Sequence, residues 1–124
     1  MSFVAPQFIS KIPAIDRSAA DAQPYGVVQV DDQGVIKLYN KWESEMAGVP
    51  ISVAEGSNFF TQVAACTNNR LVYGKFKDGV ARNDLDTEFN YTFTYKMKPT
   101  NVRIRMLRHT PSGSNWVFVS MRVA

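Results

Sequence analysis

The sequence contains one cysteine and one histidine among 124 residues, and these two scarcities exclude several classes of protein. The single cysteine, Cys66, excludes an internal disulfide and fits a reducing compartment, so we expect the protein in the cytoplasm. Cys66 and His109 do not have the spacing of a zinc site, and no glycine-rich phosphate-binding loop is present. Metal-dependent and nucleotide-dependent chemistry is therefore not indicated.

Long apolar runs are also missing. No segment approaches the roughly 20 apolar residues of a transmembrane helix, and residues 1–7 lack the basic and apolar regions of a signal peptide. We therefore expect no membrane insertion. Hydrophobic residues make up 45% of the chain and charged residues 20%, which is typical of one soluble globular domain.

The net charge is small, because 14 Lys and Arg residues stand against 11 Asp and Glu residues. The basic residues are spread along the chain, so they indicate no polyanionic partner. Arg103 and Arg105 stand near aromatic residues, as in some sheets that bind single-stranded nucleic acid, but the RNP pattern of RNA-binding sheets is absent. We expect these arginines on the solvent side of an edge strand, no nucleic-acid partner, and a monomer, with a weak dimer as the alternative.

Residues 1–24 form a lead segment that differs from the rest of the chain. The apolar residues between Phe8 and Ile15 have a helix-like spacing, and a second short helix is predicted from Asp16. Neither piece is long enough to be stable alone. We expect the segment to dock as an N-terminal helical cap on a main body formed by residues 25–124, and to detach more easily than that body.

Alternating apolar residues and turn signals predict five strands in two groups. The first group is a hairpin over residues 25–40 with a turn at residues 31–34, and the second comprises residues 87–95, 102–109 and 115–123. Helices are predicted over residues 41–47 and over residues 71–82, the latter with its N-cap at Thr67, Asn68 or Asn69. This order indicates an α+β fold, with one antiparallel sheet and helices on its faces.

Glu43 has two interpretations. Asn40 is a candidate N-cap of the helix over residues 41–47, and Glu43 follows three residues later, where a capping box places a carboxylate. Alternatively, Tyr39 and Glu43 are four residues apart and both turn toward one interior face. A buried Glu43 without a basic neighbour would be protonated at neutral pH, because burial penalises the charged form. The spacing alone leaves both interpretations open.

Cys66 also has two interpretations. It ends an apolar stretch, and a lone cysteine in such a place is commonly a small core side chain. Alternatively, its sulfur carries a covalently bound group. The helix over residues 71–82 begins shortly after Cys66, and the positive end of the helix dipole favours a thiolate. A distant pairing of Cys66 with His109 stays open, although His109 is expected to be solvated.

Several motifs carry a resemblance. They are Leu38-Tyr39-Asn40, Gly56-Ser57-Asn58-Phe59-Phe60, Val63-Ala64-Ala65-Cys66-Thr67, Tyr73-Gly74-Lys75-Phe76-Lys77-Asp78-Gly79-Val80-Ala81, Phe89-Asn90-Tyr91-Thr92-Phe93-Thr94-Tyr95-Lys96-Met97, Pro99-Thr100 and Trp116-Val117-Phe118-Val119. Together they resemble the photoactive yellow protein family, also called xanthopsins, which are small blue-light receptors with a PAS fold. The resemblance extends from Tyr25 to Val123 and includes the cysteine and the Tyr/Glu pair, which a generic PAS domain does not share.

The resemblance implies a p-coumaric acid (4-hydroxycinnamic acid) chromophore bound as a thioester to Cys66. It also implies that Tyr39 and a protonated Glu43 donate hydrogen bonds to the phenolate oxygen of the chromophore. An apolar slot lined by aromatic rings suits a flat conjugated ring, and two O–H donors suit a phenolate. The positions that match the pocket of the family are Ala47, Val49, Phe59, Val63, Ala64, Thr67, Phe93, Tyr95 and Met97.

The implied function is that of a light sensor and not of an enzyme. In the family, light isomerises the double bond of the chromophore, the glutamic acid passes its proton to the phenolate, and the N-terminal cap partly unfolds to give the signalling state. The chain departs from the commonest family pattern at Ala47, Val49 and Ala65, where that pattern has threonine, arginine and proline. We therefore expect altered colour, dark-state protonation and cycle rate.

Two alternatives to this function are open. One is a PAS-like interaction module without a chromophore, although the chain retains the cysteine, the tyrosine and the glutamic acid together. The other is a thiol acyl-transfer enzyme that uses Cys66, which lacks an evident general base. The sequence predicts no particular downstream signalling partner.

Overall fold

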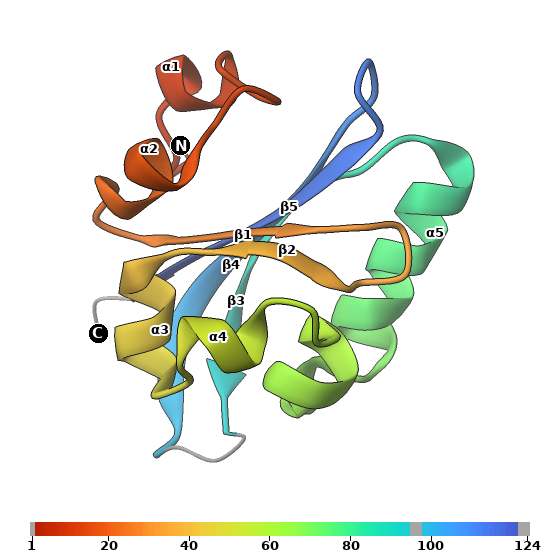
Figure 1. Cartoon of the computed structure of the whole chain (residues 1–124). Helices are drawn as coiled ribbons and strands as arrows, with labels where there is room; N and C mark the ends of the chain where they lie inside the picture. The colour runs from red at the N-terminus through yellow and green to blue at the C-terminus, as the bar shows by residue number, and fades with distance from the viewer. Residues whose placement is uncertain (1, 95–97, 122–124) are drawn as a thin grey trace.

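Within the residues that the computed structural model describes, 2–94 and 98–121, a five-stranded antiparallel sheet forms the centre of the fold (Figure 1). The strands are β1 (Gly26–Val30), β2 (Ile36–Tyr39), β3 (Asp86–Phe93), β4 (Thr100–His109) and β5 (Ser114–Met121). Their order across the sheet is β2-β1-β5-β4-β3, so the first and the last strand pair in its middle. The predicted α+β fold with one antiparallel sheet is confirmed.

The predicted turn at residues 31–34 joins β1 to β2. The Asp31 carboxylate accepts hydrogen bonds of 2.9 Å from the backbone N–H groups of Gln33 and Val35. Gly34 has a φ of 94°, in the left-handed region that glycine adopts without steric cost. Turn chemistry and alternating apolar residues therefore specify this hairpin locally.

Three helices follow β2 and cover one face of the sheet (Figure 1): α3 (Lys41–Ala47), α4 (Ile51–Ala54) and α5 (Lys75–Arg82). The Asn40 side chain accepts a hydrogen bond of 3.1 Å from Glu43 N–H and so N-caps α3. Two short turns, η1 (Phe59–Val63) and η2 (Ala65–Thr67), carry the chain onward from α4. Among the described residues, no helix is both long and apolar enough to span a lipid bilayer.

The helix predicted over residues 71–82 differs in its first turn. It begins as one turn of π-helix, η3 (Arg70–Gly74), and continues as α5. Of the three candidate N-caps, Asn69 is the one that caps it, because its side chain accepts a hydrogen bond of 3.0 Å from Val72 N–H. Apolar spacing does not distinguish a π turn from an α turn of this length, so the sequence predicted the position of the helix and missed its geometry.

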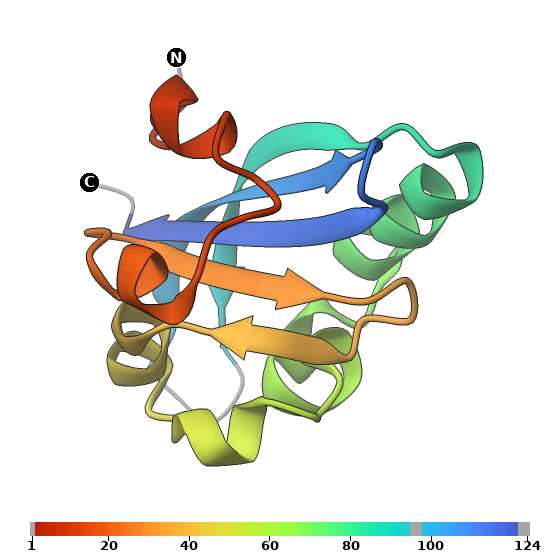
Figure 2. The same cartoon turned by 45° about the horizontal axis from the view of Figure 1, so that its top comes forward.

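Two apolar cores lie on opposite faces of the sheet. The first lies between the sheet and α3, α4 and α5, and its largest buried side chains include Tyr39, Phe59, Phe60, Phe76, Ile104 and Met106. On the other face, α1 (Pro6–Ile9) and α2 (Arg17–Asp21) cover part of the sheet (Figure 2). Phe8 and Ala20 from these helices pack there with Val27, Trp116 and Phe118 of the strands.

Tyr25 sits in the middle of the second core, just before β1. Its ring makes edge-on contacts with Phe3, Phe8 and Phe118, at centroid distances of 5.6, 6.1 and 6.2 Å. Its buried hydroxyl has no hydrogen-bond partner within the described part of the chain. Burial raises the pKa of Tyr25 to about 12, so the hydroxyl remains protonated.

The prediction that Arg103 and Arg105 lie on an edge strand is wrong, because β4 is an interior strand. β5 folds back between β1 and β4, a non-local pairing that the order of strands along the chain does not reveal. Arg103 Nε donates to Glu88 at 2.6 Å, and Arg105 Nε donates to Asp86 at 2.9 Å. These ion pairs engage both arginines with carboxylates of β3. The predicted ends of two strands, at Tyr95 and Val123, lie outside the described residues.

Candidate functional site

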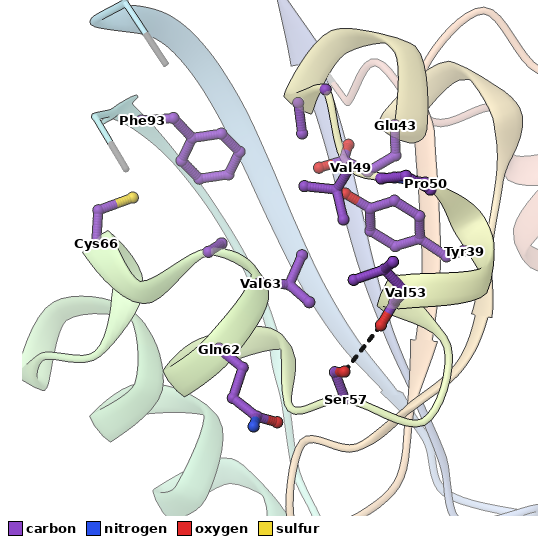
Figure 3. A pocket seen from close by; sticks show the side chains of 13 residues that line it. Tyr39, Glu43, Val49, Pro50, Val53, Ser57, Gln62, Val63, Cys66 and Phe93 are labelled. Carbon is purple, nitrogen blue, oxygen red and sulfur yellow. Dashed lines mark hydrogen bonds between the residues drawn. The ribbon is translucent and has the colours of Figure 1, made fainter. Parts of the chain in front are cut away.

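A cavity of about 270 Å³ lies where α3, α4 and the turn at η1 and η2 meet the sheet (Figure 3). Of the residues that the sequence analysis singled out, its lining includes Tyr39, Glu43, Ala47, Val49, Val63, Ala64, Cys66 and Phe93. It also includes Gly48, Pro50, Val53, Ser57 and Gln62, which the sequence did not assign to a pocket. Ligand pockets in proteins typically measure roughly 300–1,000 Å³, and this cavity, at the small end of that scale, has room for one small molecule.

The remaining predicted pocket residues lie elsewhere. Phe59 and Thr67 are fully buried, and in the described part of the chain neither borders the cavity. Phe59 belongs to the first core, and the Thr67 hydroxyl donates to Ala64 O at 2.6 Å. Both residues therefore belong to the packing around the cavity and not to its lining. Tyr95 and Met97 lie outside the described residues.

Glu43 projects from the first turn of α3 into this cavity and is only 1% exposed (Figure 3). Its Oε1 has no hydrogen-bond partner among the described residues. Burial raises the pKa of Glu43 from its ordinary 4.5 to about 8. The carboxyl is therefore mostly protonated at neutral pH and can donate a hydrogen bond.

The structure separates the two interpretations of Glu43. Asn40 does N-cap α3, but its own backbone N–H donates to Val27 O of β1 at 3.1 Å rather than to a Glu43 carboxylate. The capping-box interpretation is therefore wrong. The carboxyl lies instead against β1, where a Cβ added at Gly26 would overlap Glu43 Oε1 and lie 3.1 Å from Glu43 Cδ. The absent side chain of Gly26 leaves the space that admits Glu43 to the interior.

Tyr39, at the end of β2, is fully buried and lines the same end of the cavity (Figure 3). Its hydroxyl also has no hydrogen-bond partner within residues 2–94 and 98–121. Burial, and to a lesser extent the Glu43 carboxyl, raise the pKa of Tyr39 far above its ordinary value, so the hydroxyl stays protonated. A buried polar group without a partner costs about 1–3 kcal/mol. Two such O–H groups at one end of a cavity favour a ligand that brings an acceptor.

Cys66 lies at the other end of the cavity, in η2 and on the same side as Phe93 (Figure 3). It is half-buried, and it is the single cysteine of the sequence. Its backbone carbonyl accepts a hydrogen bond of 2.5 Å from the Tyr91 hydroxyl and one of 3.1 Å from Asn69 Nδ2. These two bonds fix the turn that carries the thiol.

The sequence does not predict the contacts through which three further residues shape the site. The sequence offers Asn69 as a candidate N-cap, but it does not predict the second hydrogen bond of this side chain, to Cys66 O three residues earlier. Tyr91 and Phe93 alternate with polar residues in the strand predicted over residues 87–95, but nothing in that alternation predicts the partner of the Tyr91 hydroxyl. Gly26 gave no local signal at all, because its contact joins β1 to α3.

This arrangement can hold a flat, mostly apolar molecule with an acceptor at one end and a bond to sulfur at the other. The described lining contains no lysine, arginine or histidine, so neutral O–H donors would have to stabilise an anionic acceptor. Among the described residues, no group of three His, Cys, Asp or Glu side chains is placed to bind a metal ion. His109 is outside the lining, with its Nδ1 2.6 Å from Ser112 Oγ, so the pairing of Cys66 with His109 has no support.

Known proteins resemble this chain in sequence and in structure. No family model matches it. The photoactive yellow protein of Rhodothalassium salexigens is 39% identical over 99 residues, covering 80% of this chain and 79% of that protein. The photoactive yellow protein of Halochromatium salexigens is 40% identical over 95 residues, covering 77% of this chain and 76% of that protein.

Solved structures of related domains also resemble this chain. The photoactive yellow protein domain of the sensor histidine kinase Ppr from Rhodospirillum centenum superimposes with a TM-score of 0.83 at 40% identity, covering 90% of this chain and 97% of that chain. A PAS domain of an HTR-like protein from Haloarcula marismortui has a TM-score of 0.63 at 11% identity, over 94% of this chain and 96% of that chain, and shows the shared fold. The fold is therefore the PAS fold, and the chain belongs to the photoactive yellow protein family.

Proposed function

We propose that the chain is a blue-light receptor that carries p-coumaric acid as a thioester on Cys66. Its relatives in the photoactive yellow protein family support a photoreceptor role. One observation supports the particular chromophore. The buried Tyr39 hydroxyl and Glu43 Oε1 lack hydrogen-bond partners among the described residues, and they line the end of the cavity that lies away from the Cys66 sulfur.

Each residue has a distinct task in this proposal. Cys66 forms the thioester, and the Tyr91 and Asn69 bonds to its carbonyl hold the attachment point in place. Tyr39 and protonated Glu43 donate their O–H groups to a phenolate oxygen, which charge-assisted hydrogen bonds stabilise in an apolar pocket. The bound group supplies a double bond that isomerises between trans and cis when it absorbs blue light.

The proton of Glu43 carries the signal in this scheme. Because the pKa of Glu43 is about 8 and its ordinary value 4.5, ionising it in place costs roughly 5 kcal/mol at about 1.36 kcal/mol per pKa unit. A small domain has a total stability of only about 5–15 kcal/mol. Loss of the proton from Glu43 therefore favours a local opening that lets water reach the carboxylate, and we propose that residues 1–24 are released as an N-terminal cap.

The proposed cycle turns over no substrate, so the protein acts as a sensor and not as an enzyme. The solved relative from Rhodospirillum centenum is a domain of a sensor histidine kinase. By analogy we propose a signalling protein as the downstream partner of this chain, and we place the chain in the cytoplasm as a monomer. Neither nucleic acid nor a membrane has a part in the scheme.

Intact mass and absorption test the proposal together. The purified chain is incubated with activated p-coumaric acid, and we expect a yellow product that is heavier by one p-coumaroyl group. The isosteric variant Cys66→Ser removes the thiol and is expected to abolish both changes. A colourless product of unchanged mass from the unmodified chain would refute the proposal. A product that releases its acyl group to added thiols over many turnovers would support the acyl-transfer alternative instead.

A further inference from the structure

Two side chains outside the cavity hold the backbone of Tyr39. Glu55, the C-cap of α4, accepts a hydrogen bond of 3.0 Å from Tyr39 N–H through its Oε2. Arg17, the first residue of α2, donates from Nη1 to Tyr39 O at 3.2 Å and from Nη2 to the same Glu55 oxygen. The three residues close a ring of polar contacts around the N–H and C=O of Tyr39.

This ring lies at the free edge of the sheet. Tyr39 ends β2, which is an edge strand. Earlier in β2, Ile36 N–H donates to Ser57 O and Ile36 O accepts from Gly56 N–H, both at 2.9 Å, so a backbone segment covers the edge there. At Tyr39 the Arg17–Glu55 ion pair takes the place of such a segment. The orientation of the last residue of β2 therefore depends on two side chains, one of which belongs to α2.

The position of Arg17 is not explained by the stability of its own helix. It stands in the first turn of α2, where the helix dipole disfavours a cation. The Arg17 and Glu55 side chains are 45% and 28% exposed, and an ion pair of that exposure contributes little stability by charge alone. The planar guanidinium can, however, bind a carboxylate and a carbonyl at once in a fixed geometry. The geometry of the contact therefore matters more than its charge.

We propose that Arg17 and Glu55 are positioning residues that couple the docking of α2 to the orientation of Tyr39 in the cavity. The role of Tyr39 toward a chromophore rests on the proposed function, whereas the coupling itself belongs to the chromophore-free chain. Coupling between two sites is reciprocal. A docked α2 holds the Tyr39 donor in place, and a ligand that fixes Tyr39 strengthens the docking of α2.

The test uses two readouts on the full chromophore-free chain, hydrogen exchange at the amides of α2 and the 13Cζ resonance of Tyr39. We expect Arg17→Gln and Glu55→Gln each to speed exchange in α2 by roughly three- to tenfold, the range that one lost hydrogen bond gives. Both are also expected to shift the Tyr39 resonance, and the double variant should add little to either effect. The matched control is Arg103→Gln, which breaks the ion pair of Arg103 with Glu88 elsewhere on the sheet and is expected to change neither readout.

Arg17→Lys separates charge from geometry. Lysine can still pair with Glu55 but cannot also reach the Tyr39 carbonyl in the same planar arrangement. We expect near-normal exchange in α2 with a shifted Tyr39 resonance, and a shifted absorption band once p-coumaric acid is attached. Faster exchange with an unchanged Tyr39 resonance in Arg17→Gln and Glu55→Gln would overturn the proposal, as would no change in either readout. Failure of the proposed function would appear separately, as no attachment to Cys66 while both chromophore-free readouts still respond.

Discussion

Glu43→Gln is expected to change how the stability of the chromophore-free chain depends on pH. The pKa of Glu43 is about 8 in the folded chain, and its ordinary value is 4.5. Because the folded-state pKa is the higher of the two, the neutral carboxyl stabilises the fold fully below pH 4.5, and this stability is lost as the pH rises toward 8. At about 1.36 kcal/mol per pKa unit, the loss is roughly 5 kcal/mol over the whole window and roughly 3 kcal/mol by pH 7.

Urea unfolding at several pH values measures this loss. Glutamine is neutral at every pH, so the difference in unfolding free energy between the unmodified chain and Glu43→Gln isolates the contribution of one carboxyl. With a slope of about 1–3 kcal/mol per M urea, a change of roughly 5 kcal/mol moves the midpoint by roughly 2–5 M relative to the variant. The fluorescence of Trp116, which is buried beneath the first two helices, can report the transition.

A matched control lies on the same helix. Glu45 is exposed on the solvent side of α3, and the pH profile of Glu45→Gln is expected to follow that of the unmodified chain. If the difference between the unmodified chain and Glu43→Gln stays constant from pH 4.5 to pH 8, the carboxyl is not buried as a neutral acid. The reasoning about the proton of Glu43 would then fail with it.

Three further changes probe the rest of the site. Gly26→Ala would drive a Cβ into the Glu43 carboxyl, so we expect stability to fall by about 1–3 kcal/mol in urea unfolding, and the absorption band of the loaded protein to shift. Tyr91→Phe removes the hydroxyl that binds Cys66 O, and we expect a stability loss of about 0.5–1.5 kcal/mol and slower attachment of activated p-coumaric acid, followed by mass. Because the described lining holds no cation, the loaded protein is expected to show protonated and ionised bands together in an absorption titration, and Val49→Arg is expected to favour the ionised band.

Matched controls exist for two of these variants. A Cβ added at Gly74 would meet its nearest neighbours at 3.6 Å, an ordinary contact, so Gly74→Ala should not lower stability. Tyr73→Phe removes an exposed hydroxyl that donates to Gln33 O at 3.1 Å, and it should leave the attachment rate unchanged. An unmoved absorption band in Gly26→Ala, equal attachment rates for the two tyrosine variants, or a single ionised band down to strongly acid pH would each contradict the corresponding prediction.

Local chemistry made much of the fold predictable. The turn at Asp31 and Gly34 and the N-cap at Asn40 each depend on residues within a few positions, and a sequence displays those directly. The order of the strands in the sheet could not be predicted from the sequence in the same way. The pairing of β1 with β5 joins opposite ends of the chain, so the interior position of β4 could not be inferred from neighbouring elements.

For the candidate site, too, the sequence indicated some residues and not others. Tyr39 and Glu43 were suggested by their spacing, and the resemblance to a known family named them together with Cys66. The residues that position them were hidden, because Gly26, Glu55 and Arg17 act through contacts between separate elements. A close approach between β1 and α3, or an ion pair that covers a strand edge, depends on the completed tertiary structure and leaves no periodic trace in the sequence.

The hydroxyl of Tyr25 lowers the stability of the contact between the first two helices and the sheet. The ring gains from its edge-on neighbours, but a hydroxyl buried without a partner among the described residues forfeits about 1–3 kcal/mol of that gain. The hydroxyl regains hydrogen bonds with water as soon as the helices move away. The docked state of these helices is therefore less stable than its buried apolar surface implies, because water solvates the Tyr25 hydroxyl in the undocked state. A phenylalanine at this position would have made the same interface tighter and slower to open.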